Sequence, residues 1–219
     1  MTRTPPTSAA QLFLTPGFTL GITGHRDLSP TLMAQYTHLM GVWFDKIRPT
    51  KVVSGMALGI DTVAAELALE REIPLIAIIP GPWQPDQWKS DHQDRWAGLC
   101  AKAEKVMIVD PSPLPADSSA RKAKVISTLL KRNTWIVANS TMLLACWDGR
   151  TGGGTTHAIR AAQKDNCPVL RLRPGTQGRL ALGPVQVQRL LSDAETLGPI
   201  KPGLPTGLVP VVVPEAVSA

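Results

Sequence analysis

Short apolar runs alternate along the chain with longer segments in which apolar residues recur at helical spacing. Residues 18–23 form an apolar run that ends at Gly24, and residues 30–46 then carry an apolar stripe with a helical period. Ser29 suits the capping position of that segment, and Pro30 suits its first turn, where an amide hydrogen would be unpaired in any case. This pair of segments is typical of a strand followed by a helix.

The strand-then-helix unit repeats over most of the chain. Apolar runs predict strands at residues 18–23, 51–55, 73–80, 105–110, 141–147 and 168–173. Helical spacing predicts helices at residues 30–46, 58–72, 91–103, 119–138 and 155–165. Because the strands are apolar on both faces, helices should cover both sides of the sheet. We therefore expect an α/β fold with a doubly wound, mostly parallel, Rossmann-like sheet and helices on both faces.

The alternation stops near residue 175, where prolines become frequent. Proline is excluded from helix interiors and central strands, so within residues 176–219 only 185–197 could hold a helix. We expect three regions: an N-terminal extension at 1–16, a Rossmann-like domain at 17–175 and a Pro-rich C-terminal tail at 176–219.

Composition excludes several classes of protein. The chain has 219 residues, of which 43% are hydrophobic, and this is enough for one well-buried core. Its three cysteines form no CxxC pair, which argues against a disulfide framework or a zinc site. No apolar stretch approaches the roughly 20 residues that span a bilayer, and the N-terminus lacks the pattern of a signal peptide. We expect a cytoplasmic protein without a metal site.

Positive charge is concentrated in the second half of the predicted domain. Residues 18–117 contain 9 Lys or Arg against 12 Asp or Glu, whereas residues 118–175 contain 10 against 2. Clustered cations raise the local concentration of anions, as a nucleic acid or an anionic ligand would require. A solvated helix face is the alternative explanation for the cations of residues 119–138.

Three of the predicted strand-to-helix turns combine glycine with small hydroxyl residues. Their sequences are TGHRDLS, SGMALGID and DGRTGGGTTH. In a doubly wound sheet such turns meet at the carboxyl edge, where each following helix should present unpaired amides and its positive dipole end. Together they predict an anion site, most simply for phosphate. None contains the GKS or GKT of a P-loop, and no GxGxxG follows the first strand.

Two of these segments resemble a known family. SGMALGIDTVAAELAL is similar to a turn and helix of the DprA/Smf DNA-processing proteins, and RNTWIVANSTMLLACWDGRTGGGTTHAIRAA is similar to a later segment of the same proteins. The ITGHRDL motif and the Trp-containing stretch after the third strand resemble the YpsA-like group still more closely. Both groups belong to the SLOG superfamily of Rossmann-like proteins. The resemblance covers about residues 18–173 and implies the same fold.

The resemblance also implies roles for particular residues. It places Gly55, Gly59 and Asp61 around a pocket, with Arg132 and Asn133 beside it. LOG phosphoribohydrolases of this superfamily use a GGxGTxxE turn, and the carboxylate of that motif is missing here. The phosphate cradle therefore survives in the sequence, but LOG-type catalysis does not follow from it.

Residue chemistry and resemblance together give the candidate site. His25 and Arg26 are further candidates to contact an anion, and Trp88 or Trp147 offers a flat face for a base. The predicted ligand-binding residues are Thr23, Gly24, His25, Arg26, Ser54, Gly55, Met56, Ala57, Gly59, Asp61, Arg132, Asn133, Trp147, Asp148, Gly149, Arg150, Gly152, Gly153, Gly154, Thr155 and Thr156.

Three functions fit these features. The leading hypothesis is non-catalytic binding or sensing of a nucleotide or nucleotide-derived ligand. The second is DprA-like binding of single-stranded DNA, whose phosphates would occupy the same site. The third is a LOG-like phosphoribohydrolase with His157 or Asp61 as acid or base, which the missing carboxylate disfavours. No other cofactor and no membrane partner are expected, and a homo-oligomer is compatible with these features.

Overall fold

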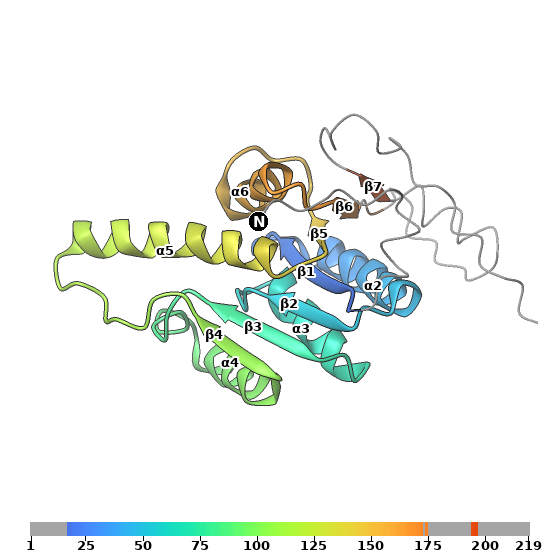
Figure 1. Cartoon of the computed structure of the whole chain (residues 1–219). Coiled ribbons are helices and arrows are strands. Elements are labelled where there is room, and N and C mark those ends of the chain that lie inside the picture. Colours follow the sequence, from blue (N-terminus) through green and yellow to red (C-terminus); the bar gives the residue numbers. More distant parts are fainter. Residues whose placement is uncertain (1–16, 173, 175–193, 197–219) are drawn as a thin grey trace, which may run out of the picture.

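Seven strands form one sheet in the computed structural model, which describes residues 17–172, 174 and 194–196 (Figure 1). The strands are β1 (Thr19–Gly24), β2 (Lys51–Ser54), β3 (Leu75–Ile79), β4 (Lys105–Ile108), β5 (Met142–Cys146), β6 (Val169–Leu172) and β7 (Ala194–Thr196). The helices are α2 (Pro30–Ile47), α3 (Ile60–Glu70), α4 (Ser90–Lys102), α5 (Ser118–Ala138) and α6 (Gly153–Lys164). β1 to β6 are parallel, and β7 pairs antiparallel with β6.

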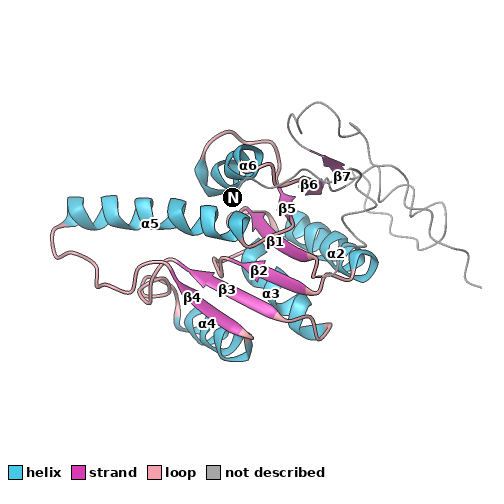
Figure 2. Cartoon of the chain, in the orientation of Figure 1, coloured by secondary structure: helices cyan, strands magenta, loops and turns pink. Residues whose placement is uncertain are grey.

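Two apolar layers lie between the sheet and its helices. α2, α3 and α4 cover one face, whereas α5 and α6 cover the other (Figure 2). Neighbouring strand residues point to opposite layers, so that Leu144 packs on the α2 and α3 side and Leu143 on the α5 and α6 side. Both leucines are fully buried, which explains why the central strands are apolar along their whole length. The predicted fold class is confirmed.

The order of the strands opens a crevice at one edge of the sheet. The order is β4-β3-β2-β1-β5-β6-β7, so β1 lies between β2 and β5. The chain leaves β1 for a helix on one face and leaves β5 for a helix on the other. The two turns therefore part at the carboxyl ends of β1 and β5, and ligands of doubly wound sheets bind at such a switch point.

The N-terminal half of helix α5 extends beyond the sheet. Near its C-terminal end Ile136 and Val137 are buried against the sheet, but most residues of its first half are exposed, and that end reaches beyond the strands in Figure 1. Asp117 caps the projecting end, because its Oδ1 accepts a hydrogen bond of 2.7 Å from the amide of Ala120. No helix among residues 17–172 is long and apolar enough to cross a membrane.

Two local predictions differ from the structure. α6 begins at Gly153, two residues earlier than predicted, so the last two of the three consecutive glycines lie in its first turn. Residues 194–196 form a strand and not part of a helix, because they pair with the free edge of β6. The N-terminal extension and the rest of the predicted tail lie outside the described residues.

The junction of β1 with α3 should tolerate no added methyl group at Gly24. A Cβ at this position would collide with the side chain of Ile60, which is fully buried and cannot move aside. We expect Gly24→Ala to destabilise the fold by about 1–3 kcal/mol. Gly98→Ala is the matched control, because Gly98 lies on an exposed face of α4 with nothing near it, and it should stabilise by up to about 1 kcal/mol. Chemical denaturation measures both, and effects of the same sign would contradict the prediction.

Candidate functional site

A cavity of about 790 Å³ lies at the switch point between β1 and β5. Its walls come from the turn after β1, the turn after β2, one side of α5 and the turn into α6. The structure brings together thirteen of the predicted residues along these walls: Thr23, Gly24, His25, Arg26, Ala57, Asp61, Arg132, Asn133, Arg150, Gly152, Gly153, Gly154 and Thr155.

The turn between β5 and α6 leaves amides unpaired. Gly152 and Gly153 have φ angles of +89° and +75°, a conformation that favours glycine. Gly152 is the N-cap residue of α6 and offers no side-chain acceptor, and within the described chain nothing accepts a hydrogen bond from the amides of residues 153–155. These donors and the positive end of the helix dipole meet the cavity, which is how helix N-termini bind anions.

The other two helices differ from our expectation, because their first amides have partners. Ser29 caps α2 by accepting a hydrogen bond from the amide of Leu32 at 3.2 Å. In α3 the amide of Thr62 donates to the carbonyl of Ala57 at 3.1 Å, and that of Ile60 to the carbonyl of His25 at 3.4 Å. These two helices therefore present fewer unpaired amides than predicted, because Ser29, His25 and Ala57 accept hydrogen bonds from them.

A buried ion pair connects the two helical layers at the base of the cavity. Arg132 of α5 donates from Nη1 to Oδ2 of Asp61 of α3 at 3.0 Å, and both side chains are more than nine-tenths buried. Burial raises the pKa of Asp61, whereas Arg132 and the Ala57 amide partly offset this effect. Gly55 makes room for the pair, because a Cβ there would occupy the position of the guanidinium.

The guanidinium of Arg132 has N–H groups without an acceptor in the described part of the chain. Within the described residues its side chain makes only the hydrogen bond to Asp61, and its Nε is buried without any partner. A guanidinium carries five N–H groups, and buried donors are normally satisfied. Arg132 lines the cavity, so an acceptor that enters the cavity could accept hydrogen bonds from these unpaired N–H groups.

Two further polar residues, one on α5 and one in the turn after β1, line the same wall of the cavity. Asn133 donates from Nδ2 to the carbonyl of Gly154 at 3.0 Å and thereby fixes the start of α6 against α5. Arg26 is exposed, lines the cavity and has no side-chain partner among the residues described. Its charge acts on both Asp61 and Arg132, which places it near the buried pair.

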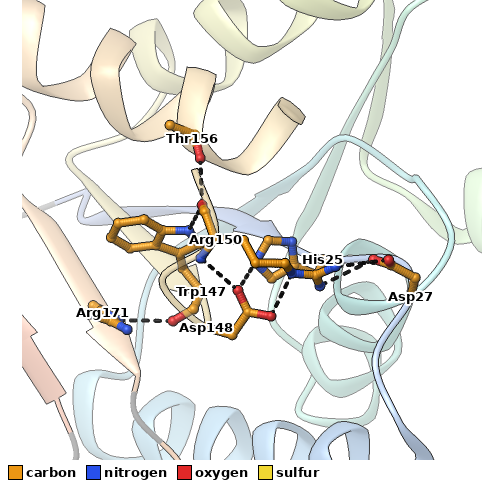
Figure 3. A network of polar contacts seen from close by, with 7 residues as sticks. All are labelled: His25, Asp27, Trp147, Asp148, Arg150, Thr156 and Arg171. Atoms are coloured by element: carbon orange, nitrogen blue, oxygen red, sulfur yellow. Dashed lines mark hydrogen bonds and ion pairs between the residues drawn. The ribbon is translucent and has the colours of Figure 1, made fainter. Parts of the chain in front are cut away.

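Arg150 is already neutralised by carboxylates at the rim of the cavity (Figure 3). It donates to Asp27 from Nη1 at 2.9 Å and to Asp148 from Nε at 2.7 Å. Asp148 also lies 2.9 Å from Nε2 of His25. Burial lowers the pKa of His25 below its ordinary 6.5, so this ring is mainly neutral at pH 7. Neither Arg150 nor His25 adds a free cation to the cavity.

Trp147 contacts the turn between β5 and α6 and does not line the cavity. Its indole Nε1 donates to the carbonyl of Arg150 at 2.7 Å, and the guanidinium of Arg171 lies over the ring at 4.8 Å (Figure 3). Thr156 donates to the same Arg150 carbonyl at 3.1 Å. Because Arg171 covers the ring, the structure does not support the prediction that Trp147 stacks a base.

The remaining predicted residues lie outside the cavity wall. Ser54 holds the turn after β2, since its hydroxyl donates to the Asp61 carbonyl at 2.8 Å and accepts from the Met56 amide at 3.1 Å. His157 is also outside the wall, and burial lowers its pKa. Those of the predicted binding residues that do not line the cavity are Ser54, Gly55, Met56, Gly59, Trp147, Asp148, Gly149 and Thr156.

Sequence reasoning missed seven residues of the cavity wall, among them Ile22 of β1 and Ile136 of α5. Ile126, Leu129 and Leu130 of α5 line the cavity, and so do the polar residues Asp27 and Thr151. The apolar residues follow helical spacing and continue the stripe that includes Asn133, so the period of α5 was a usable signal.

Comparison with known proteins agrees with this architecture. The sequence matches, over residues 12–187, the profile of the family described as DNA recombination-mediator protein A. The structure resembles DNA processing protein A from Helicobacter pylori, the subject of a study of its single-stranded DNA binding mode, at 18% identity with a TM-score of 0.55 over 86% of each chain. It also resembles DNA processing protein A from Streptococcus pneumoniae at 16% identity and a TM-score of 0.56, over 78% of this chain and 55% of that one.

The chain therefore spans only about half of the Streptococcus protein. At such identities the two likenesses show a shared fold, and the family profile confirms the resemblance drawn from the SGMALGID and RTGGGT segments. No curated protein matches the sequence.

The buried ion pair gives a prediction about stability. Asp61→Asn removes the charge that compensates Arg132 in a buried position, and we expect a loss of about 3 kcal/mol in the free energy of unfolding. Asp45→Asn is the matched control, because Asp45 pairs with Arg71 at 2.7 Å on the surface, where ion pairs contribute little. Urea denaturation of both variants distinguishes the two sites, and equal losses would contradict the importance of the buried pair.

Proposed function

We propose, from the premise that the chain belongs to the DNA recombination-mediator protein A family, that it binds single-stranded DNA. A backbone phosphate would occupy the cavity between the first turn of α6 and the guanidinium of Arg132. The site would hold the strand by its backbone and would carry out no reaction. The cavity residues that the sequence predicted to bind a ligand are proposed to bind the strand.

One observation carries the proposal. Arg132 is 95% buried in the wall of the cavity with most of its donors unused, and the free amides of residues 153–155 face the same cavity. Phosphate oxygens accept several hydrogen bonds at once, and a charged acceptor makes each of them stronger. A phosphate would therefore satisfy two sets of donors that the protein leaves unpaired.

The charge of the surroundings supports a long anion such as a nucleic acid strand. Residues 118–175 contain 10 Lys or Arg against 2 Asp or Glu, and α5 presents Arg121, Lys122 and Lys131 at exposed positions. Neutralised phosphates release counterions, so each such contact adds affinity without reading the base sequence.

A nucleotide or nucleotide-derived small molecule is the second candidate ligand. The cavity of about 790 Å³ is within the range of small-molecule sites, and its donors suit a single phosphate equally well. Competition separates the two candidates, because a dedicated nucleotide site should be blocked by micromolar mononucleotide, whereas a strand-binding site should not.

Fluorescence anisotropy with a labelled oligo(dT) tests the proposal. We expect binding that weakens steeply as salt is raised, and Arg26→Ala should reduce the salt slope by about 0.7, the value for one lost phosphate contact on a single strand. Lys102→Ala is the matched control, because Lys102 is an exposed cation of α4, on the other layer, and should change nothing. Absence of binding at low salt, or an affinity independent of salt, would contradict the proposal.

Gly154→Ala tests the cradle itself. Gly154 does not have a positive φ, and a Cβ there would make an ordinary contact at 3.7 Å with Nδ2 of Asn133, so the fold should tolerate it. At the cavity wall the same methyl group should obstruct the phosphate and weaken oligo(dT) binding by about tenfold, or 1.4 kcal/mol.

Gly153→Ala serves as the companion variant, because its φ of +75° adds backbone strain to the same obstruction. It should lower both the melting temperature and the affinity. Full affinity in the Gly154→Ala protein would mean that the glycines only turn the chain.

A further inference from the structure

The side of α5 that faces the cavity is polar at Arg132 and Asn133 and apolar on the N-terminal side of them, and the buried Ile136 follows on their C-terminal side. Arg132 and Asn133 lie beside the start of α6, whereas Ile126, Leu129 and Leu130 line the same cavity one to two turns nearer the N-terminal end. A turn of helix rises about 5 Å, so the apolar part begins within about 5–10 Å of the polar part. We call Ile126, Leu129 and Leu130 the aliphatic ledge.

Two of the three side chains of the aliphatic ledge are exposed although they are apolar, and Leu129 is half-buried. Ile126 is 48% and Leu130 36% exposed, although α5 has buried positions for such side chains further along. Among the described residues, the other large apolar side chains with comparable exposure are Val106 and Ile108 of the edge strand β4, outside the cavity. Apolar side chains gathered at the mouth of a polar cavity indicate a ligand with an apolar part.

We propose that the aliphatic ledge holds a nucleobase of the strand whose phosphate lies at the start of α6. This inference rests on the proposed function and adds the part of the DNA that the ledge contacts. The occupant must be anionic at one end and flat and apolar a few ångströms away, and a nucleotide within a strand has both features. The base would cover Ile126 and Leu130, which water covers in the free protein.

The ledge would recognise a base by contact alone. Its three side chains carry no hydrogen-bonding group, so they distinguish a base from its absence but do not read base edges. Aromatic residues do not take this role, because no tryptophan lines the cavity and Arg171 covers the ring of Trp147. The contact is thus expected to tolerate any sequence and to depend on the presence of the base.

Two oligonucleotides of equal length test the inference: oligo(dT) and an abasic strand with the same number of phosphates. Wild-type protein should bind oligo(dT) more tightly, since burying two half-exposed aliphatic side chains is worth about tenfold in affinity. The double variant I126Q/L130Q should lose that advantage and bind both strands with the affinity of the wild type for the abasic one. Glutamine keeps the helix intact at these exposed positions.

Val106→Thr is the matched control, because Val106 is 40% exposed but lies outside the cavity, and it should leave both affinities unchanged. Equal binding of the two strands by wild-type protein would overturn the inference and leave the proposed function standing. So would an equal loss of affinity for both strands in the double variant. If wild-type protein binds neither strand, the proposed function fails, and the inference fails with it.

Discussion

The ion pair between Asp61 and Arg132 joins the two halves of this molecule where they would otherwise separate. α3 belongs to one layer and α5 to the other, and the turns from β1 and β5 diverge between them. A carboxylate and a guanidinium buried together at 3.0 Å close the base of the resulting crevice. The absence of a side chain at Gly55 is a condition for this pair, since any Cβ there would displace Arg132.

The same pair leaves N–H groups of Arg132 available in the cavity. Asp61 satisfies one donor of Arg132 and leaves the remaining N–H groups unused, including an Nε that is buried without a partner. If acceptors of the protein paired every N–H group of the guanidinium, none would be left to bind a phosphate. A buried arginine with no partner at all would destabilise the fold. Partial compensation by one carboxylate lies between these two limits.

At the rim of the cavity, in contrast, the arginine is paired with two carboxylates. Arg150 is shared between Asp27 and Asp148, and Asp148 also contacts His25 (Figure 3). These contacts hold the turn after β1 against the turn before α6 and so keep the mouth of the cavity in shape. Among the described residues of the cavity wall, the arginines without a carboxylate at the rim are Arg26 and Arg132, and they lie near one another. The sequence alone would have ranked Arg150 with them, because Arg26 and Arg150 both lie in the turns singled out by their glycines.

Sequence alone determined the sheet, its helices and the edge at which the glycine turns meet, because apolar periodicity and turn chemistry act over a few residues. Turn chemistry, together with the family resemblance that pointed to Asp61, Arg132 and Asn133, predicted thirteen residues of the cavity wall. Which of those residues have free donors was decided only by tertiary structure. The carbonyl of His25 accepts from the amide of Ile60, Asp27 reaches Arg150 across 123 positions, and Asp61 meets Arg132 across 71. These contacts depend on partners that are distant in the sequence and that only the folded chain brings together, so a local pattern identifies candidate ligands but not the ones still available to bind.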